Sequence, residues 1–186
     1  IEDTDRNRFV EGAVENLINA LKWAGLDYDE GPDIGGDYWP YMQSQRVDIF
    51  KHYAEIFFQN GNAYFCFCTP ERLQRLRQEQ EKQKLPQAKY DKHCLKLSKE
   101  EINKNFNDNI PYVIRLNVKP YQKIVFNDII RNEVEFDSNN IDDQVLIKSD
   151  GYPTYHLANV VDDYLMNISH VIRGEEWLSS TPKHVI

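Results

Sequence analysis

The spacing of apolar residues changes along this chain, and the change limits the folds open to it. Near the start, apolar side chains recur at intervals of three and four residues, at Val10, Val14, Leu17 and Leu21. The same spacing returns over residues 47–57, just before Asn60 and Gly61, which favour a helix end. From residue 63 onward, short apolar or alternating segments are typical of strands. A fold that mixes helices and strands is therefore expected.

The order of these segments predicts how the chain is organised. Strands are expected at residues 63–68, 112–118, 124–126, 134–136 and 145–147. Thr69-Pro70 and the Ser98 to Glu101 capping box predict helix starts between them. Later segments are expected to form a helix at residues 155–163, a buried strand at 168–173 and a new helix near Trp177. We interpret residues 62–149 as an α+β module inserted into an α/β core made by residues 1–61 and 150–186.

Composition excludes several classes of protein. The net charge of −8 rules out a generally basic nucleic-acid coat, and 41% hydrophobic with 12% aromatic residues is too rich for a disordered chain. No apolar run approaches a membrane span, and no basic-then-apolar signal peptide opens the sequence. Because three cysteines do not make a disulfide framework, we expect a cytoplasmic protein. The missing initiator Met and the apolar-periodic end predict a piece of a longer protein.

Charge is concentrated in one segment. Residues 72–99 hold nine basic and three acidic side chains, although the whole chain is acidic. Basic residues with aromatics between them can bind a phosphate backbone. The alternative is a solvated helix face, which would normally mix its charges more evenly.

The cysteines have a spacing suited to a metal. Cys66 and Cys68 lie one residue apart, and Cys94 follows with Tyr90 and His93 just before it. Zinc takes four tetrahedral N, S or O ligands, usually as two pairs from two short segments. The second pair would be Cys94 with either Tyr90 or His93. The alternative is three reduced cysteines in a core, where free Cys is often buried.

The last forty residues hold candidate binding groups. Tyr155 and Asn159 share a helix face, and Arg173 follows the predicted strand. A guanidinium at the end of a strand can bind a carboxylate or phosphate with two hydrogen bonds, or it can pair internally with Glu175 or Asp163.

Two other sets of residues have structural interpretations. The acidic residues at the start of the sequence, which include Glu2, are interpreted as a helix cap. The scattered histidines, His156 and His184 among them, are interpreted as core or surface residues because no nucleophile lies beside them in the sequence.

Four stretches resemble the bacterial glutamyl-tRNA synthetases, which are class I aminoacyl-tRNA synthetases. They are Ile1-Glu2-Asp3-Thr4-Asp5-Arg6, residues 21–32 (LKWAGLDYDEGP), residues 148–163 (KSDGYPTYHLANVVDD) and residues 171–178 (VIRGEEWL). The resemblance implies a split Rossmann domain interrupted by an α+β insertion that holds the tRNA acceptor end. It also implies the reaction: ATP with Mg²⁺ activates L-glutamate as glutamyl-adenylate, and the acyl group passes to the 3′ end of tRNA(Glu). A monomer is expected.

The resemblance also implies roles for single residues. Arg173 would bind the side-chain carboxylate of glutamate, with Tyr155 and Asn159 completing that pocket. Glu2 would contact the ammonium group, Trp177 would line the pocket, and Glu176 would lie on the ATP side. Cys66, Cys68, Tyr90 and Cys94 match a zinc-binding pattern found in some members. Others use a His two residues after the last Cys, and this position is Lys96 here.

Two features of the family are missing from this sequence. The ATP-handling motifs, His-Ile-Gly-His and Lys-Met-Ser-Lys, do not occur in it, and neither does an anticodon-reading domain. The catalytic residues are therefore expected before Ile1 and after Ile186, and these 186 residues alone should not activate glutamate. Two alternative functions remain: a paralogue that attaches glutamate to a modified (queuosine-type) tRNA base, and a non-catalytic, zinc-stabilised nucleic-acid-binding module.

Overall fold

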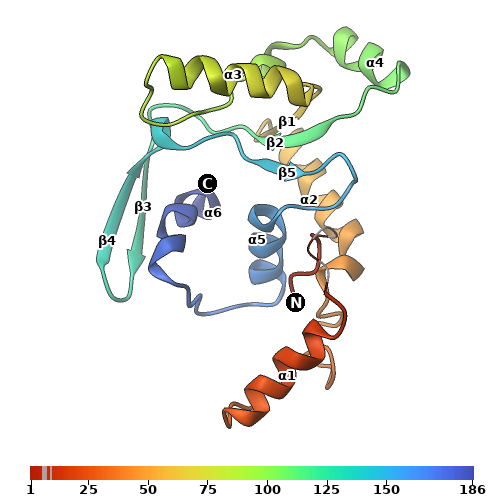
Figure 1. Ribbon diagram of the computed structural model, residues 1–186, viewed down its shortest axis with the longest axis vertical. Helices are drawn as coiled ribbons and strands as arrows, with labels where there is room; N and C mark the ends of the chain where they lie inside the picture. The colour runs from red at the N-terminus through yellow and green to blue at the C-terminus, as the bar shows by residue number, and fades with distance from the viewer. Residues whose placement is uncertain (6–7, 9) are drawn as a thin grey trace.

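The computed structural model describes residues 1–5, 8 and 10–186; Arg6, the last residue of the first motif, lies outside them. Its central sheet has three antiparallel strands in the order β1 (Ala63–Cys66), β2 (Val113–Leu116) and β5 (Val145–Ile147). Helices α2 (Val47–Gln59) and α5 (Tyr155–Leu165) lie on one side of the sheet. Helices α3 (Pro70–Lys82) and α4 (Lys99–Asn107) lie on the other (Figure 1). The two sides carry separate apolar clusters, because successive side chains on a strand point to opposite faces.

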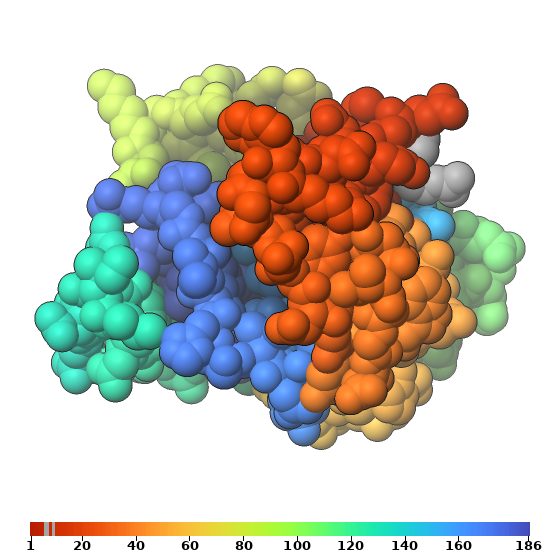
Figure 2. All heavy atoms as spheres, turned by 90° about the horizontal axis from the view of Figure 1, so that it is seen from below, coloured from red at the N-terminus to blue at the C-terminus, as the bar shows by residue number. Residues whose placement is uncertain are grey.

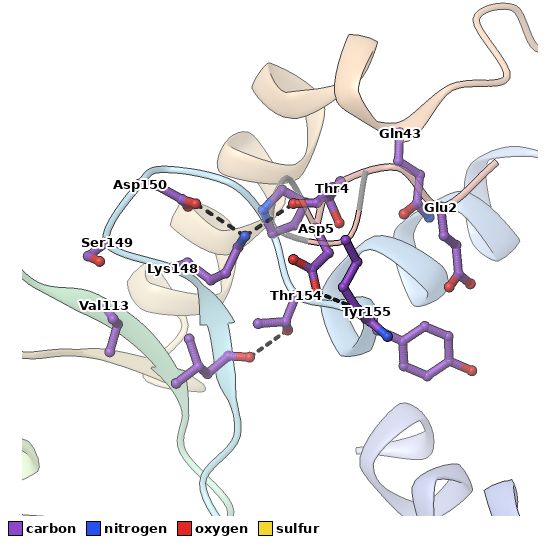
Figure 3. A pocket seen from close by; sticks show the side chains of 13 residues that line it. Glu2, Thr4, Asp5, Gln43, Val113, Lys148, Ser149, Asp150, Thr154 and Tyr155 are labelled. Atoms are coloured by element: carbon purple, nitrogen blue, oxygen red, sulfur yellow. Dashed lines mark hydrogen bonds and ion pairs between the residues drawn. The ribbon is translucent and has the colours of Figure 1, made fainter. Parts of the chain in front are cut away.

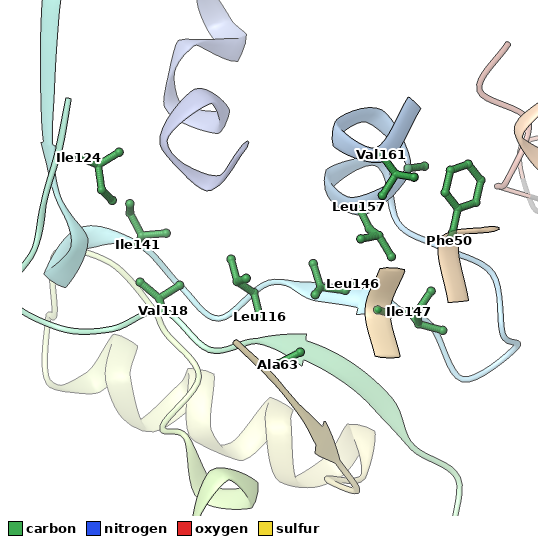
Figure 4. Close-up of a cluster of buried hydrophobic side chains, with 12 residues drawn as sticks. Phe50, Ala63, Leu116, Val118, Ile124, Ile141, Leu146, Ile147, Leu157 and Val161 are labelled. Carbon is green, nitrogen blue, oxygen red and sulfur yellow. The ribbon is translucent and has the colours of Figure 1, made fainter. Parts of the chain in front are cut away.

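The larger cluster joins all three parts of the chain. It draws on α2, on the three strands of the sheet, on the segments around the β3–β4 hairpin and on α5 (Figure 4). Its best-buried members are Phe50 and Ala54 of α2 and Leu157 and Ala158 of α5, each at most 1% exposed. Residues on both sides of the predicted insertion therefore pack against its sheet, and this contact sets the position of α5.

A separate hairpin stands beside this core. Strands β3 (Lys123–Asp128) and β4 (Asn132–Asp137) pair only with each other in the described part of the chain. In Figure 2 the hairpin (teal) is separated from the N-terminal helices (red and orange) by the C-terminal segment (blue). An ion pair of 2.7 Å joins Arg131 at its tip to Glu175 in that segment. The hairpin thus contacts the part of the chain that follows Arg173.

Local sequence signals explain several helix ends. Thr69 Oγ1 accepts a hydrogen bond from the Arg72 backbone N–H at the start of α3, and both halves of the Ser98 capping box are formed at α4. The first predicted helix is α1 (Ala13–Trp23), which ends before Gly25 at positive φ. No α1 residue is buried, and the helix projects from the body in Figure 1. Its apolar spacing is correct for a helix, but its apolar face is only partly covered by the other described residues.

One predicted strand is wrong. Residues 168–173 form neither strand nor helix, and Ile172 is 94% exposed. Apolar residues form a strand only where a neighbouring strand accepts their backbone hydrogen bonds, and no described strand lies beside this segment. All strand pairs in residues 1–5, 8 and 10–186 are antiparallel, so these residues alone do not form the expected parallel sheet. The segment ends at a 3₁₀ turn, Glu175–Ser180, and the short helix α6 (Thr181–Val185).

Across the part of the chain that the structure describes, no helix has the length and apolar character needed to cross a membrane.

Candidate functional site

A polar pocket of about 610 Å³ lies between the N-terminal segment, the loop after β5 and the start of α5. Figure 3 shows Glu2 and Gln43 together at one end of it, with Lys148 and Asp150 at the other. Lys148 Nζ donates to Asp150 Oδ2 at 3.2 Å and to the Thr4 carbonyl oxygen at 3.1 Å. The pocket is therefore lined by carboxylates and by an ammonium group that is already neutralised, which suits a small polar ligand.

The predicted amino-acid contacts meet around Tyr155, at the first turn of α5. Asn159 lies one turn further along the helix, close enough to the Tyr155 phenol to act against the rise of its pKa. The Trp177 ring packs against the Tyr155 ring with 5.1 Å between their centroids. Glu2 and Tyr155 both line the pocket, whereas Asn159, Arg173 and Trp177 surround Tyr155 outside the pocket lining. The structure thus gathers residues from three distant segments.

Arg173 is half-buried and turned toward this group. Its guanidinium Nη1 lies 3.0 Å from His184 Nδ1, and its charge influences Glu2, Tyr155 and Asp163. The internal pairings considered above do not occur among the described residues: Glu175 pairs with Arg131 at 2.7 Å, and Asp163 forms no ion pair with Arg173. The Arg173 guanidinium therefore has N–H groups without a carboxylate partner among the described residues.

Carboxylates near Arg173 are partly removed from water. Desolvation raises the pKa of Glu2 and of Asp163, while the positive charge of Arg173 opposes the rise in both cases. Desolvation also raises the pKa of Tyr155, which stays a neutral phenol. The electrostatic balance thus favours a ligand that brings both a carboxylate and a cation. Glu176 is exposed, and its carboxylate lies against Gly174, where an added Cβ would collide with Glu176 Oε2.

The cysteines form a second, closed site on the other face of the sheet. The Sγ atoms of Cys66, Cys68 and Cys94 lie within 4.8 Å of one another, and those of Cys68 and Cys94 are 3.5 Å apart. Tetrahedral zinc with Zn–S bonds of about 2.3 Å places two sulfurs about 3.8 Å apart. The Tyr90 hydroxyl oxygen lies 3.4 Å from Cys66 Sγ and 3.2 Å from Cys68 Sγ. His93 is exposed and does not join the cluster, so the geometry favours Tyr90 as a fourth ligand.

Charge around the cysteines favours a thiolate at Cys66, whereas the hydrogen bond with Cys66 raises the pKa of Cys94. A hydrogen bond with Cys94 lowers the pKa of Cys66 to about 4, and further hydrogen bonds from Tyr90 and Arg115 act in the same direction. The Arg115 side chain is buried, lies 4.2 Å over the Tyr90 ring and has no hydrogen-bond partner for its Nε. A zinc ion with three thiolates is anionic overall, so a buried guanidinium beside it compensates charge. The residues present fit a zinc ion.

A family model described as the catalytic domain of class I tRNA synthetases (E and Q) matches residues 1–186, the whole chain. The chain belongs to this family. Two glutamate–tRNA ligases similar to it come from Fusobacterium nucleatum, 56% identical over 186 residues, and Clostridioides difficile, 55% identical over 193 aligned positions. Both alignments cover 100% of this chain, but 36% and 39% of those proteins. The chain thus spans somewhat over a third of the relatives' length.

Solved structures of this synthetase family have the same fold. A glutamate tRNA ligase from Elizabethkingia meningosepticum, crystallised in complex with its amino acid, matches with a TM-score of 0.93 and 44% identity, covering 100% of this chain and 38% of that one. A glutamate–tRNA synthetase from Elizabethkingia anophelis matches with a TM-score of 0.94 and 44% identity, covering 100% of this chain and 39% of that one. This region of a class I synthetase therefore keeps its shape between species.

Sequence reasoning missed several polar residues of this synthetase domain. Asp162 accepts hydrogen bonds from Arg46 Nε at 2.8 Å and Gln43 Nε2 at 3.0 Å, which joins the segment before α2 to α5. His184 contacts both Arg173 and His156. Asp162 and His156 lie within residues 148–163, the third stretch that resembles the synthetase family. This resemblance was the only sequence signal that could have pointed to them. Arg46, Gln43 and His184 are distant in sequence from their partners, so no spacing could have predicted these contacts.

Proposed function

We propose that the protein to which this chain belongs is a glutamate–tRNA ligase that activates L-glutamate with ATP and Mg²⁺ and transfers it to the acceptor end of tRNA(Glu) in the cytoplasm. Several observations support the proposal: family membership over the whole chain, relatives named glutamate–tRNA ligase, and a solved neighbour crystallised with its amino acid. The observation that carries it is the Arg173 guanidinium, half-buried beside Tyr155 with no carboxylate of the described residues paired to it.

In this proposal each pocket residue has a chemical role. Arg173 pairs with the side-chain carboxylate of glutamate, and Tyr155 and Asn159 complete the pocket around it. Glu2 accepts the substrate ammonium group, and Trp177 closes the pocket against the Tyr155 ring. Glutamine has the same shape without the charge, and it would leave the guanidinium unpaired in a partly dry site. Arg173 is therefore the residue that selects the acid over its amide.

The bond changes follow from the substrates. An α-carboxylate oxygen of glutamate attacks the α-phosphorus of ATP, and pyrophosphate leaves. A hydroxyl of the terminal tRNA ribose then attacks the acyl carbon, and AMP leaves. Residues of this chain hold the amino acid during both steps, and Glu176 lies toward the nucleotide. The groups that stabilise the phosphate charges belong to the signature motifs, which this sequence does not contain.

The domain arrangement is part of the proposal. Residues 1–61 and 150–186 belong to a split Rossmann domain, and residues 62–149 form the insertion that contacts the tRNA acceptor end. In the insertion, Cys66, Cys68, Tyr90 and Cys94 hold one structural Zn²⁺, which ties β1 to the segment after α3.

The test is pyrophosphate exchange by the complete protein, with and without tRNA, for wild type and for Arg173→Ala. We expect the KM for glutamate to rise at least about a hundredfold while the KM for ATP changes by about twofold or less, because a lost charge-assisted pair costs about 3 kcal/mol. Lys123→Ala is the control, since it removes an exposed positive charge on the hairpin. Equal losses for both substrates would contradict the role of Arg173.

A second measurement separates the proposed ligase from a base-modifying enzyme. The acylated RNA is digested with a nuclease, and the glutamate label is located either on the terminal adenosine or on an internal nucleoside. We expect it on the terminal adenosine of tRNA(Glu). A label on an internal base would overturn the proposed product, and a wild-type protein with no exchange activity would overturn the proposed chemistry.

A further inference from the structure

Arg173 lies on a segment that its own backbone does not hold in place. Among the described residues, 169–173 take part in no backbone hydrogen bond, and they form neither helix nor strand. A long, flexible side chain on such a segment can point in many directions. Among the described residues, side-chain contacts set its direction.

Two histidines supply those contacts. His184 of α6 has Nδ1 at 3.0 Å from Arg173 Nη1 and Nε2 at 3.1 Å from His156 Nδ1. His156 is the second residue of α5, next to Tyr155, and α5 is fixed by the main core through Leu157 and Ala158. The contacts thus connect the guanidinium to the best-packed helix of the molecule.

The chemistry of the three groups fixes the direction of both hydrogen bonds. A guanidinium only donates, so His184 Nδ1 must accept from Arg173. A neutral imidazole that accepts at Nδ1 carries its proton on Nε2, and His184 therefore donates to His156 Nδ1. Desolvation lowers the pKa of His156 to about 4 and that of His184 to about 3, with Arg173 adding to both effects, so both rings are neutral near pH 7. The Tyr155 ring also packs on His184, with 5.5 Å between ring centroids.

We propose that His184, supported by His156, is a positioning residue for Arg173: it holds one guanidinium N–H and so directs the remaining N–H groups toward the substrate carboxylate beside Tyr155. The inference rests on the proposed function, because it assumes that Arg173 binds this carboxylate. His184 does not touch the substrate in this arrangement. It acts only through Arg173.

The experiment uses the complete protein with His184→Leu, which removes both hydrogen bonds, and His184→Asn, which keeps an acceptor close to the Nδ1 position. We expect His184→Leu to raise the KM for glutamate about tenfold, as for the loss of one hydrogen bond to a charged group, with the KM for ATP within about twofold. His184→Asn should recover most of the affinity. Calorimetric titration with glutamate gives the same comparison without turnover, and thermal melting shows which variants are folded.

A double-mutant cycle separates positioning from general damage. In the Arg173→Ala background, His184→Leu should change the KM for glutamate by less than about twofold, because the group that it positions is gone. Equal effects of His184→Leu in both backgrounds would overturn the inference, as would a wild-type KM in a folded His184→Leu protein. If Arg173→Ala itself leaves the KM for glutamate unchanged, the proposed role of Arg173 fails first, and the two failures are distinguishable.

Discussion

The cysteine cluster and the polar pocket beside Tyr155 lie in the same chain but are built in opposite ways. The cluster is closed: Cys66 and Cys94 are 2% and 4% exposed, and backbone N–H groups of residues 67 and 94 are hydrogen-bonded within it. The pocket is open and polar, and the Arg173 guanidinium beside it sits on a segment without backbone hydrogen bonds to the other described residues. The first site is formed by the fold of residues 62–149. The second is assembled by side chains that reach between segments.

The difference shows what each site depends on. Around the cysteines, Asp143 is 2% exposed and accepts from Tyr64 Oη at 2.6 Å and from Lys92 Nζ at 2.6 Å, so this buried carboxylate is fully paired within the fold. Arg173 contacts His184 but has no carboxylate partner among the described residues, and in the proposed function this partner is the substrate. We therefore expect changes at the cluster to act on stability and metal content, and changes at the pocket to act on substrate affinity.

The largest effect is expected from breaking the closed site. Cys66→Ser in the complete protein should abolish zinc binding and lower the free energy of unfolding by about 4 kcal/mol, because metal binding contributes directly to folding. Metal analysis of the purified protein and denaturant titration measure the two quantities. A chelator should destabilise the wild type and leave Cys66→Ser unchanged. A wild-type protein that is folded and free of metal would contradict the prediction.

Two further variants identify the fourth ligand within that site. Tyr90→Phe should weaken zinc affinity, since the phenol oxygen lies within 3.4 Å of two cysteine sulfurs. His93→Ala should leave zinc affinity unchanged, because this side chain is exposed and outside the cluster. Competition with a coloured chelator measures both. The opposite ranking would assign the position to His93.

The next largest effect is expected at the back of the open pocket. Arg46 and Asp162 form an ion pair with side chains 5% and 13% exposed. Arg46→Met leaves a largely buried carboxylate without its cation and should cost about 3 kcal/mol of unfolding free energy. Arg72→Met is the matched control, because its pair with Asp91 is 27% and 35% exposed and should cost less than about 1 kcal/mol. Equal losses would show that burial does not separate the two pairs.

The same contrast explains how much could be predicted from the sequence. Local signals were sufficient for the caps at Thr69 and Ser98, for the helix face shared by Tyr155 and Asn159, and for the cysteine spacing, because each involves residues within a few positions. Contacts such as Arg46 with Asp162, 116 residues apart, depend on the packing of α2 against α5. The strand predicted at residues 168–173 was wrong because an apolar pattern does not reveal whether a partner strand is present.

A smaller effect is expected from pH. The pKa values of His156 and His184 are lowered from 6.5 to about 4 and about 3. Between these values and pH 6.5, the unfolded chain therefore binds more protons than the folded chain. Their stability contribution is complete above about pH 6.5 and is lost as the pH falls toward 4, by about 2 kcal/mol per histidine near pH 5. Glu2 and Asp163, whose pKa values are raised, oppose this loss at lower pH.

The wild type must therefore be compared with His184→Asn, which retains those carboxyl groups. Denaturant titrations between pH 7 and pH 5 should show a steeper loss of unfolding free energy for the wild type than for the variant. Parallel curves would mean that His184 does not contribute to the pH dependence.

The smallest effect is expected at the contact between the hairpin and the open pocket. Arg131 and Glu175 form an exposed pair, with side chains 35% and 81% exposed, only two residues from Arg173. Since exposed ion pairs contribute little, Arg131→Gln should change the free energy of unfolding by less than about 0.5 kcal/mol and the KM for glutamate by less than about twofold. Melting curves and exchange kinetics measure both. A tenfold rise in KM would show that the hairpin, and not only His184, positions the segment carrying Arg173, and the open site would then depend on the fold more than we propose.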